Sequence, residues 1–340
     1  MRKKANKGFN ECLPGKDMSM GLAKKILEGD IQAAARLLNC IEDEVQGTNE
    51  ELKELYPYTG KAYVVGLTGS AGVGKSTLIN VFIKDLRKKG LTVGVIVIDP
   101  TSPFTGGAIL GDRLRMQGHS LDQEVFIRSV ATRGWKGGLS KATIGMIHVM
   151  DALGKDIILV ETVGTGQGEI EVSKISDACV IILSPGAGDE VQMMKAGILE
   201  VADIFVVNKA DKEGAAEVKL KLEGMIYSRS LAASSTLSEW KPKVILTNAL
   251  GDKGIEELTE SVFEHRNFLT ATGELEKRRQ ERARTELMDT IKNSVEKHIY
   301  QATSKDAYLE ELVNKVASRE VDPYTAASKI LRTFTPIVMN

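Results

Sequence analysis

The sequence predicts an α/β fold: a doubly wound, mostly parallel sheet with an N-terminal helical segment and a C-terminal helical arm. Seven short runs predict strands, and most of them are β-branched and apolar throughout, as expected for strands that are buried on both faces of a parallel sheet. Helical stretches between the runs supply the crossovers that parallel strands require. The runs are AYVVGLT (62–68), LTVGVIVID (91–99), EVFIRS (124–129), DIILVE (156–161), ACVIILS (178–184), DIFVVN (203–208) and KVILT (243–247).

The chain separates into three zones by the spacing of its apolar residues. Residues 1–58 have apolar side chains near helical spacing and predict an N-terminal helical segment. Residues 59–271 carry all of the runs and predict the main α/β domain. Residues 272–340 are dense in charge, and Asp322 followed by Pro323 is a typical start of a last helix. One apolar stripe at helical spacing runs along this zone: Met288, Ile291, Val295, Ile299 and Ala302.

The composition excludes several classes of protein. The 340 residues carry 45 Lys and Arg against 46 Asp and Glu, so the chain has no overall attraction to nucleic acid or an anionic membrane. No apolar run approaches the roughly 18 residues of a membrane-spanning helix, and the basic N-terminus lacks the apolar segment of a signal peptide. The cysteines stand far apart, in no metal or disulfide pattern. We therefore expect a cytoplasmic protein without nucleic-acid or membrane partners.

The segment GSAGVGKS at 69–76 fits the G-x-x-x-x-G-K-[ST] pattern of a P-loop in full. It follows the first run and precedes the helical stretch STLINVFIKDLRKKG, which is the context that the motif requires. Its glycines let successive backbone N–H groups wrap phosphates at a helix N-terminus. We expect Lys75 to reach the terminal phosphates and the Ser76 hydroxyl to ligate Mg²⁺. The nucleotide-binding residues predicted in this segment are Gly69, Ser70, Ala71, Gly72, Val73, Gly74, Lys75, Ser76 and Thr77.

A second motif predicts the base. The sequence Asn208-Lys209-Ala210-Asp211 closes the run DIFVVN. The Asp211 carboxylate can accept from both N1–H and the exocyclic amine of guanine, whereas adenine presents an acceptor at N1 and has no amine at C2. A site built on such a pair rejects the wrong base because polar groups are left unsatisfied. The motif therefore predicts GTP and GDP as ligands. The candidate second base-contacting loop, after the run KVILT, is Asn248, Ala249 and Leu250.

Acidic residues near strand ends form a candidate magnesium site. Glu161 ends the run DIILVE and is followed closely by Gly164, which suits a loop whose N–H senses the γ-phosphate. Asp99 ends the second run, and Asp112 lies in the glycine-rich stretch after it, which suits a segment ordered by nucleotide and metal. The predicted metal ligands are Ser76, Asp99, Asp112 and Glu161. The predicted catalytic residues are Lys75, Asp99, Asp112 and Glu161.

Several longer strings are far more specific than the P-loop: GSAGVGKST, DPTSPFTGGAILGDRLRM, VFIRSVATRGWKGGLS, ETVGTGQGE, SPGAGDEVQMMKAGILEVAD and NKAD. Through them the sequence resembles the MeaB/ArgK family of P-loop GTPases, which are associated with methylmalonyl-CoA mutase and related to the human cobalamin protein of type A. The resemblance runs from about Leu22 to Asp322. It implies a GTPase that gates adenosylcobalamin loading and protects a cobalamin-dependent acyl-CoA mutase. Methylmalonyl-CoA mutase is the expected partner, with a cobalamin adenosyltransferase as a further candidate.

The resemblance also implies switch segments and a dimer. The first switch would run from Asp99 to Arg115, and the second from Glu161 to about Ser173. A third, in GDEVQMMKAG, would couple the partner to hydrolysis, and the C-terminal arm would form a homodimer. Thr165 stands where Ras-like enzymes place a water-orienting glutamine, so we expect slow intrinsic hydrolysis that a partner accelerates. The residues implied in switching or partner coupling are Arg113, Arg115, Gly164, Gln167, Asp189 and Lys195.

Three other functions compete with this interpretation. A metallochaperone GTPase needs a metal store, yet the four histidines are isolated in the sequence and no C-x-x-C is present. A nucleotide-dependent kinase or ATPase linked to amino-acid transport is disfavoured by Asp211, which matches guanine. A non-catalytic module that uses nucleotide only for structure would differ by showing no turnover, with or without a mutase.

Overall fold

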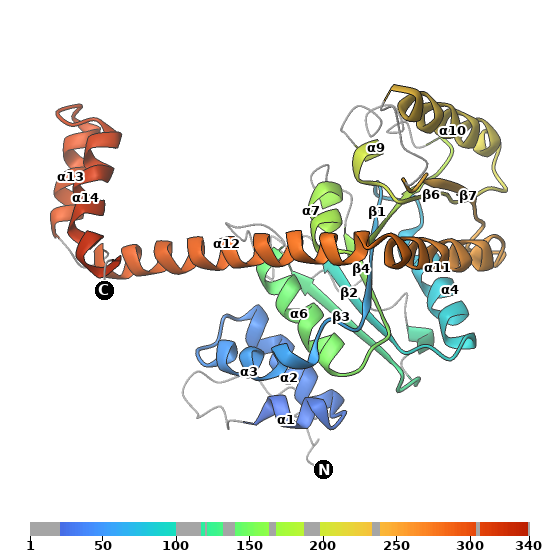
Figure 1. Cartoon of the computed structure of the whole chain (residues 1–340), viewed down its shortest axis with the longest axis horizontal. Helices are drawn as coiled ribbons and strands as arrows, with labels where there is room; N and C mark the ends of the chain where they lie inside the picture. Colours follow the sequence, from blue (N-terminus) through green and yellow to red (C-terminus); the bar gives the residue numbers. More distant parts are fainter. Residues whose placement is uncertain are drawn as a thin grey trace, which may run out of the picture. The chain divides into compact units, whose positions relative to one another are not determined.

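The structure is a computed structural model that describes residues 21–99, 117–119, 121–131, 140–162, 168–186, 198–232, 239–303 and 307–338 (Figure 1). It divides the chain into two compact units, one that ends at Glu276 and one that begins at Lys277. Within those ranges no helix is both long and apolar enough to cross a membrane.

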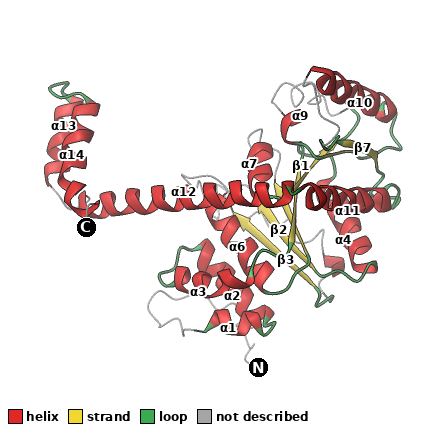
Figure 2. Cartoon of the chain, viewed as in Figure 1, coloured by secondary structure: helices red, strands yellow, loops and turns green. Residues whose placement is uncertain are grey.

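A seven-stranded sheet, with the strand order β3-β2-β4-β1-β5-β6-β7, forms the centre of the first unit (Figure 2). Each pair of neighbouring strands is parallel. The predicted doubly wound parallel sheet is therefore confirmed, and each of the apolar runs forms one strand. The strands are β1 (Tyr63–Thr68), β2 (Val93–Asp99), β3 (Val125–Ala131), β4 (Ile157–Thr162), β5 (Ala178–Leu183), β6 (Ile204–Val207) and β7 (Lys243–Leu246).

Strands β1, β4, β5 and β6 are buried on both faces, which is why their residues are mostly apolar rather than alternating, whereas the edge strands β3 and β7 are partly exposed. Val64 of β1 belongs to one hydrophobic core, and its neighbours Tyr63 and Val65 belong to the other. The core around Val65 includes α4 (Lys75–Lys88) and α11 (Ile255–Thr272). The core around Val64 includes the helices on the opposite face, which are α6 (Ser140–Ala152), α7 (Gly168–Ile175), α9 (Ile198–Val201) and α10 (Ala215–Ala232).

The N-terminal helices extend the core on the α6 side. Leu37 and Leu38 are completely buried in it, together with Met146 of α6. Glu42 of α2 forms an ion pair with Arg128 of β3, with 2.6 Å between Oε2 and Nη2. The apolar faces of these helices are therefore covered by the first unit itself. The segment consists of α1 (Leu22–Leu27), α2 (Ile31–Glu42), α3 (Thr48–Leu55) and the short 3-10 helix η1 (Tyr56–Tyr58).

A buried polar cluster joins α11 to the amino ends of the strands. The Tyr63 hydroxyl lies 2.9 Å from His265 Nδ1, and His265 Nε2 lies 3.2 Å from Asp203 Oδ1. Asp203 also accepts a hydrogen bond from the Cys179 backbone N–H at 2.8 Å. The Trp240 ring packs over His265, with 4.8 Å between the ring centroids. These contacts tie strands β1, β5 and β6 to one helix at the edge opposite to the predicted motifs, because buried polar groups require partners.

The second unit is helical, as the sequence predicts. Asp322 Oδ1 accepts a hydrogen bond from the Thr325 N–H at 2.9 Å, so it is the N-cap of the last helix. Met288, Ile291 and Val295 are 57%, 48% and 51% exposed, which leaves most of the predicted stripe in contact with solvent. The helices are α12 (Glu274–Thr303), whose first residues belong to the first unit, α13 (Ala307–Ala317) and α14 (Pro323–Val338).

Candidate nucleotide-binding site

The predicted motifs meet at the carboxyl edge of the sheet, where ligands bind in open parallel α/β folds. The P-loop connects β1 to α4, and α4 begins at Lys75. Glu161 is the residue before the last of β4, and Asn208 follows directly after β6. Because β4, β1, β5 and β6 are consecutive neighbours in the sheet, these residues come together although they are distant in the sequence.

Two glycines of the P-loop are required by close backbone approach. A Cβ on Gly69 would stand 2.1 Å from the Ile182 carbonyl oxygen, and one on Gly74 would stand 2.6 Å from Asn208 Nδ2. Gly74 also has a φ of +94°, in the left-handed region that favours glycine. The loop therefore lies directly against β5 at Gly69 and against the predicted base-reading motif at Gly74, with no room for a side chain at either position.

Lys75 lies at the start of α4 with its side chain turned back over the loop. Its Nζ donates hydrogen bonds to the carbonyl oxygens of Gly69 and Ser70, at 2.7 and 3.0 Å, and the residue is only 8% exposed. The ammonium group thus stands beside the backbone that surrounds the phosphates in P-loop proteins. A helix N-terminus and a lysine at one place form a site suited to a polyphosphate.

Ser76 and Glu161 form the best-defined part of the candidate metal site. The Ser76 hydroxyl donates to Glu161 Oε1 at 2.9 Å, and both residues are buried. Hydroxyl and carboxylate oxygens suit Mg²⁺, which commonly takes only one or two protein ligands and completes its shell with phosphate oxygens and waters. Asp99 ends β2 at the same edge, since Ile98 pairs with Thr162 next to Glu161. In the described part of the chain, no three His, Cys, Asp or Glu side chains gather into a metal-binding group.

Asn208 connects three loops of the site. Its Nδ2 donates to the Val73 carbonyl at 2.9 Å, and its Oδ1 accepts from the Thr247 hydroxyl and the Ala249 N–H, each at 3.2 Å. The Lys209 ammonium donates to the Gly72 carbonyl at 2.5 Å. The motif that is predicted to select the base thereby also fixes the P-loop.

Asp211 and the second base-contacting loop lie on neighbouring strand ends. The Ala210 N–H donates to the Thr247 carbonyl at 2.9 Å, which joins the two loops, and Asp211 is exposed beside them. The Asn248 side chain accepts from the backbone N–H groups of Leu250 and Gly251, so it stabilises its own turn. The structure thus brings the predicted base-reading residues together. The carboxylate of Asp211 is exposed to solvent.

One contact of the site was not predicted from the sequence, and some of the predicted residues lie outside the described part of the chain. Thr162 Oγ1 donates to Thr68 Oγ1 at 2.9 Å, which joins the strand before the P-loop to the strand that carries Glu161. A hydroxyl immediately before the first glycine of a P-loop is the signal that could have identified Thr68. The predicted residues that lie outside the described ranges are Asp112, Arg113, Arg115, Gly164, Thr165, Gln167, Asp189 and Lys195.

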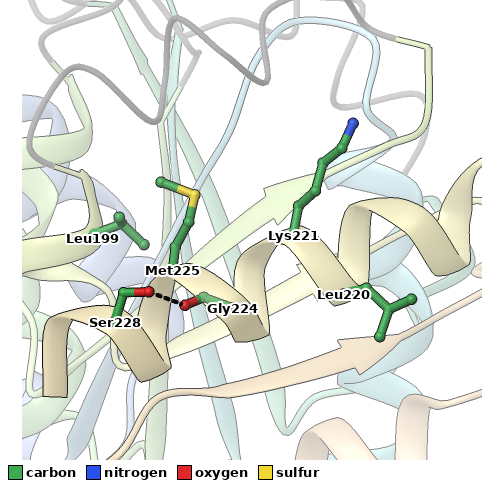
Figure 3. Close-up of a pocket in the computed structure, with 6 residues that line it drawn as sticks. All are labelled: Leu199, Leu220, Lys221, Gly224, Met225 and Ser228. Carbon is green, nitrogen blue, oxygen red and sulfur yellow. Dashed lines mark hydrogen bonds between the residues drawn. The ribbon is translucent and has the colours of Figure 1, made fainter. Parts of the chain in front are cut away.

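A separate hollow of about 570 Å³ lies between α9 and α10 (Figure 3). The Ser228 hydroxyl donates to the Gly224 carbonyl at 2.8 Å within it. The hollow contains none of the P-loop or base-reading residues and has mostly apolar walls, so it is distinct from the candidate nucleotide site. Its lining residues are Leu199, Leu220, Lys221, Gly224, Met225 and Ser228.

Comparison with known proteins agrees with the geometry. The family model described as methylmalonyl Co-A mutase-associated GTPase MeaB matches residues 34–304. A protein of Pyrococcus abyssi named as a GTPase is 46% identical and covers 92% of this chain and 95% of its own. The GTPase ArgK of Escherichia coli is 32% identical, over 90% and 94%. The mitochondrial methylmalonic aciduria type A homolog of Caenorhabditis elegans is 33% identical, over 92% and 82%. The crystal structure of an LAO/AO transport system kinase superposes with a TM-score of 0.67 at 25% identity and covers 94% of this chain and 100% of that one.

Proposed function

The chain belongs to the MeaB family of P-loop GTPases, and from that premise we propose that it is a chaperone of a cobalamin-dependent acyl-CoA mutase. In this proposal, GTP binding and hydrolysis gate the loading of adenosylcobalamin and protect the mutase from inactivation. Methylmalonyl-CoA mutase is the proposed partner, in keeping with the description of the family and the name of the Caenorhabditis elegans relative. The observation that carries the GTPase part is Asn208, which joins the P-loop to the base-reading loops.

We assign the nucleotide contacts as follows. The backbone N–H groups of residues 69–77 receive the phosphates at the N-terminus of α4, and Lys75 neutralises the terminal ones. Asp211 accepts from the guanine ring, and residues 248–250 cover the other side of the base. Because Lys75 already donates to two carbonyls of its own loop, it must exchange those contacts for phosphate oxygens when nucleotide binds.

We propose that Mg²⁺ is bound through Ser76 and Glu161, with Asp99 and Asp112 contributed by the stretch that follows β2. The ion would supply charge neutralisation between the β- and γ-phosphates. Ser76 is held for this role by its 2.9 Å contact to Glu161, which fixes the direction of the hydroxyl. Such supporting contacts are worth about 10- to 100-fold in metal affinity or activity.

Glu161→Gln is therefore expected to lower the GTP hydrolysis rate by about 10- to 100-fold and to raise the Mg²⁺ concentration needed for half-maximal rate. The amide keeps the shape of the side chain but removes its charge. The check is steady-state phosphate release over a magnesium titration, with the exposed Glu217→Gln on α10 as the matched control. Full activity of Glu161→Gln at low magnesium would refute the metal-site assignment.

We further propose that hydrolysis is slow in the isolated protein, because Thr165 follows Gly164 where a water-orienting glutamine stands in Ras-like enzymes. The mutase would accelerate it by ordering the stretches that carry Asp112, Arg113, Arg115, Gln167, Asp189 and Lys195. The cycle would take place in the cytoplasm, with a cobalamin adenosyltransferase as the source of the cofactor.

The partner is tested by phosphate release with and without purified methylmalonyl-CoA mutase, combined with co-elution of the two proteins in gel filtration. We expect complex formation that depends on the bound nucleotide and a higher rate of GTP hydrolysis in the mixture. Lys75→Ala serves as the control, because it should show no stimulated turnover. A wild-type protein that neither co-elutes with the mutase nor responds to it would contradict the proposed partner.

The exposed stripe on α12 supports a homodimer formed by the C-terminal arm. Burying a large apolar side chain stabilises a protein by about 1.5–3 kcal/mol, so covering a stripe that is half exposed would be favourable. In the described residues 21–58, the N-terminal helices already bury their apolar faces in the core that includes α6. A second copy of the arm would bury both stripes at once in a two-fold arrangement.

Ile291→Asp combined with Val295→Asp is expected to convert the dimer into a monomer that still binds GTP, because the P-loop domain is untouched. Multi-angle light scattering at micromolar concentration measures the mass, and calorimetry measures GTP affinity. The matched control is Ser294→Asp with Lys297→Asp, two exposed positions on another side of α12. A wild-type mass of one subunit would rule out the dimer.

A further inference from the structure

A pair of buried threonines joins the two strands that lead into the candidate metal site. Thr68 is the last residue of β1 and Thr162 is the last residue of β4, and they are 0% and 1% exposed. The Thr162 hydroxyl donates to the Thr68 hydroxyl oxygen at 2.9 Å. Leu67 stands opposite Glu161 in the parallel register, which brings the two threonines level with each other. The bond therefore connects the residue before the P-loop to the residue after Glu161.

The two threonines lie on the face of the sheet opposite to the proposed metal ligands. Glu161 reaches Ser76 at the start of α4, and successive side chains of a strand point to opposite faces. Thr162 therefore shares its face with Val160 of β4, which belongs to the core that includes α6. A hydroxyl in such an apolar place needs a partner, because burying it without a hydrogen bond is unfavourable. The pair can influence the metal site only through the ends of the two strands.

Together with the bond between Ser76 and Glu161, the threonine pair closes a ring that contains the whole P-loop. From Thr68 the chain runs through residues 69–75 to Ser76. The Ser76 hydroxyl crosses to the Glu161 carboxylate at 2.9 Å. The next residue, Thr162, returns to Thr68 through the second hydrogen bond. In addition to the strand ladder, two side-chain hydrogen bonds thus hold the P-loop to β4 at both of its ends, one on each face of the sheet.

We infer that Thr68 and Thr162 are positioning residues for metal-dependent GTP hydrolysis. Their hydrogen bond fixes the end of β4 against the start of the P-loop, so that Glu161 and Ser76 keep the separation at which both serve the magnesium ion. This inference rests on the metal assignment of the proposed function. A hydrogen bond suits this task because its geometry is directional, whereas apolar contact is non-directional. Loss of the bond should therefore act on the metal-dependent step even where the fold is kept.

Four variants separate position from stability. Thr68→Val and Thr162→Val each leave one buried hydroxyl without its partner, so both should lower Tm. The double variant replaces both hydroxyls by methyl groups of similar shape and should regain most of the lost Tm, because no unsatisfied polar group remains. Thr162→Ser keeps the hydroxyl but removes a buried methyl group, so it should lower Tm while the hydrogen bond remains.

GTP turnover should follow the hydrogen bond rather than the Tm. We measure kcat and KM for intrinsic hydrolysis over a magnesium titration, together with GDP affinity without magnesium. All three valine variants, the double one included, should lower kcat by about 10- to 100-fold and raise the magnesium requirement, as losses of supporting contacts at metal sites do. Thr162→Ser should keep kcat close to that of the wild type. GDP affinity without magnesium should be unchanged, because Lys75 and the P-loop backbone are retained.

Thr259→Val is the matched control, because Thr259 is also completely buried but its hydroxyl donates to the Ile255 carbonyl within α11, at 3.0 Å. It should leave kcat and the magnesium requirement at wild-type values. A double valine variant that recovers kcat together with Tm would overturn the inference, and so would single valine variants with wild-type magnesium dependence.

Glu161→Gln in the same titration shows which assignment fails. If Glu161→Gln is impaired and the valine variants are not, the role of the threonine pair is wrong and the metal assignment stands. If Glu161→Gln also behaves as the wild type, the metal assignment is wrong and the inference is overturned with it. No mutase is present in these assays, so a failure of the proposed partner would leave their outcome unchanged.

Discussion

Lys75→Ala is expected to abolish detectable GTP hydrolysis and to weaken GTP and GDP binding by roughly 10²- to 10⁴-fold. Each charge-assisted hydrogen bond contributes about 1.5–3 kcal/mol, and the ammonium would contact oxygens of two phosphates. The structure places this group beside the Gly69 and Ser70 carbonyls at 8% exposure, whereas the neighbouring Lys209 ammonium contacts the Gly72 carbonyl. We expect nucleotide affinity and kcat to fall together, because the charge contributes to both the bound ground state and the transition state.

Calorimetry with GDP and phosphate release with GTP check this result. Lys84→Ala is the matched control, because Lys84 is an exposed lysine on the same helix. This substitution removes the same charge as Lys75→Ala. Its affinity and rate should remain at wild-type values, and the Tm of both variants should show that α4 still folds. Retention of near-normal GDP affinity in Lys75→Ala would show that the backbone alone binds the phosphates.

Asp211→Asn should invert the choice of base. In the proposed complex the Asp211 carboxylate accepts two hydrogen bonds from guanine, whereas an amide would present a donor where guanine also has one. Xanthine carries a carbonyl at that position and can accept from the amide, so we expect XTP to bind more tightly than GTP in the variant. One bond to guanine is lost and the other loses its charged acceptor, which corresponds to a roughly 10²- to 10⁴-fold weaker GTP affinity.

Competition binding with GTP, XTP and ATP measures this change and also tests the transport-kinase alternative. Asp252→Asn is the control, because Asp252 is an exposed carboxylate in the neighbouring loop whose positive φ of 52° asparagine tolerates. The control should keep the wild-type order of GTP over XTP and ATP. Wild-type protein that binds ATP as tightly as GTP would contradict the guanine assignment.

The sequence was sufficient to predict the sheet and the main parts of the site. Strands buried on both faces form near-continuous apolar runs, so most of the runs could be recognised without knowing their neighbours. The P-loop and the motif at Asn208 could be placed at strand ends because phosphate and base recognition need fixed residue types at fixed spacing. Their convergence then follows from the rule that ligands bind at the carboxyl edge of a parallel sheet.

Contacts between distant residues could not be predicted in the same way. The bonds of Asn208 to Val73 and Ala249 depend on the strand order, which a single sequence does not encode locally. His119 looked isolated in the sequence because its partner is a backbone carbonyl, which any residue at position 80 would provide. In each case the missing information is the tertiary partner rather than the residue type.

The central place of β1 in the sheet has a consequence for how the protein folds during synthesis. β1 is made early, yet both of its neighbours come much later in the chain: Tyr63 pairs with Ile157, and Val65 pairs with Ala178. Contacts that are distant in sequence must overcome a large loop-closure entropy and form slowly. A nascent chain that ends before β5 therefore lacks one whole side of the strand that supports the P-loop. We expect nucleotide to begin to stabilise the growing chain only after β5 has left the ribosome.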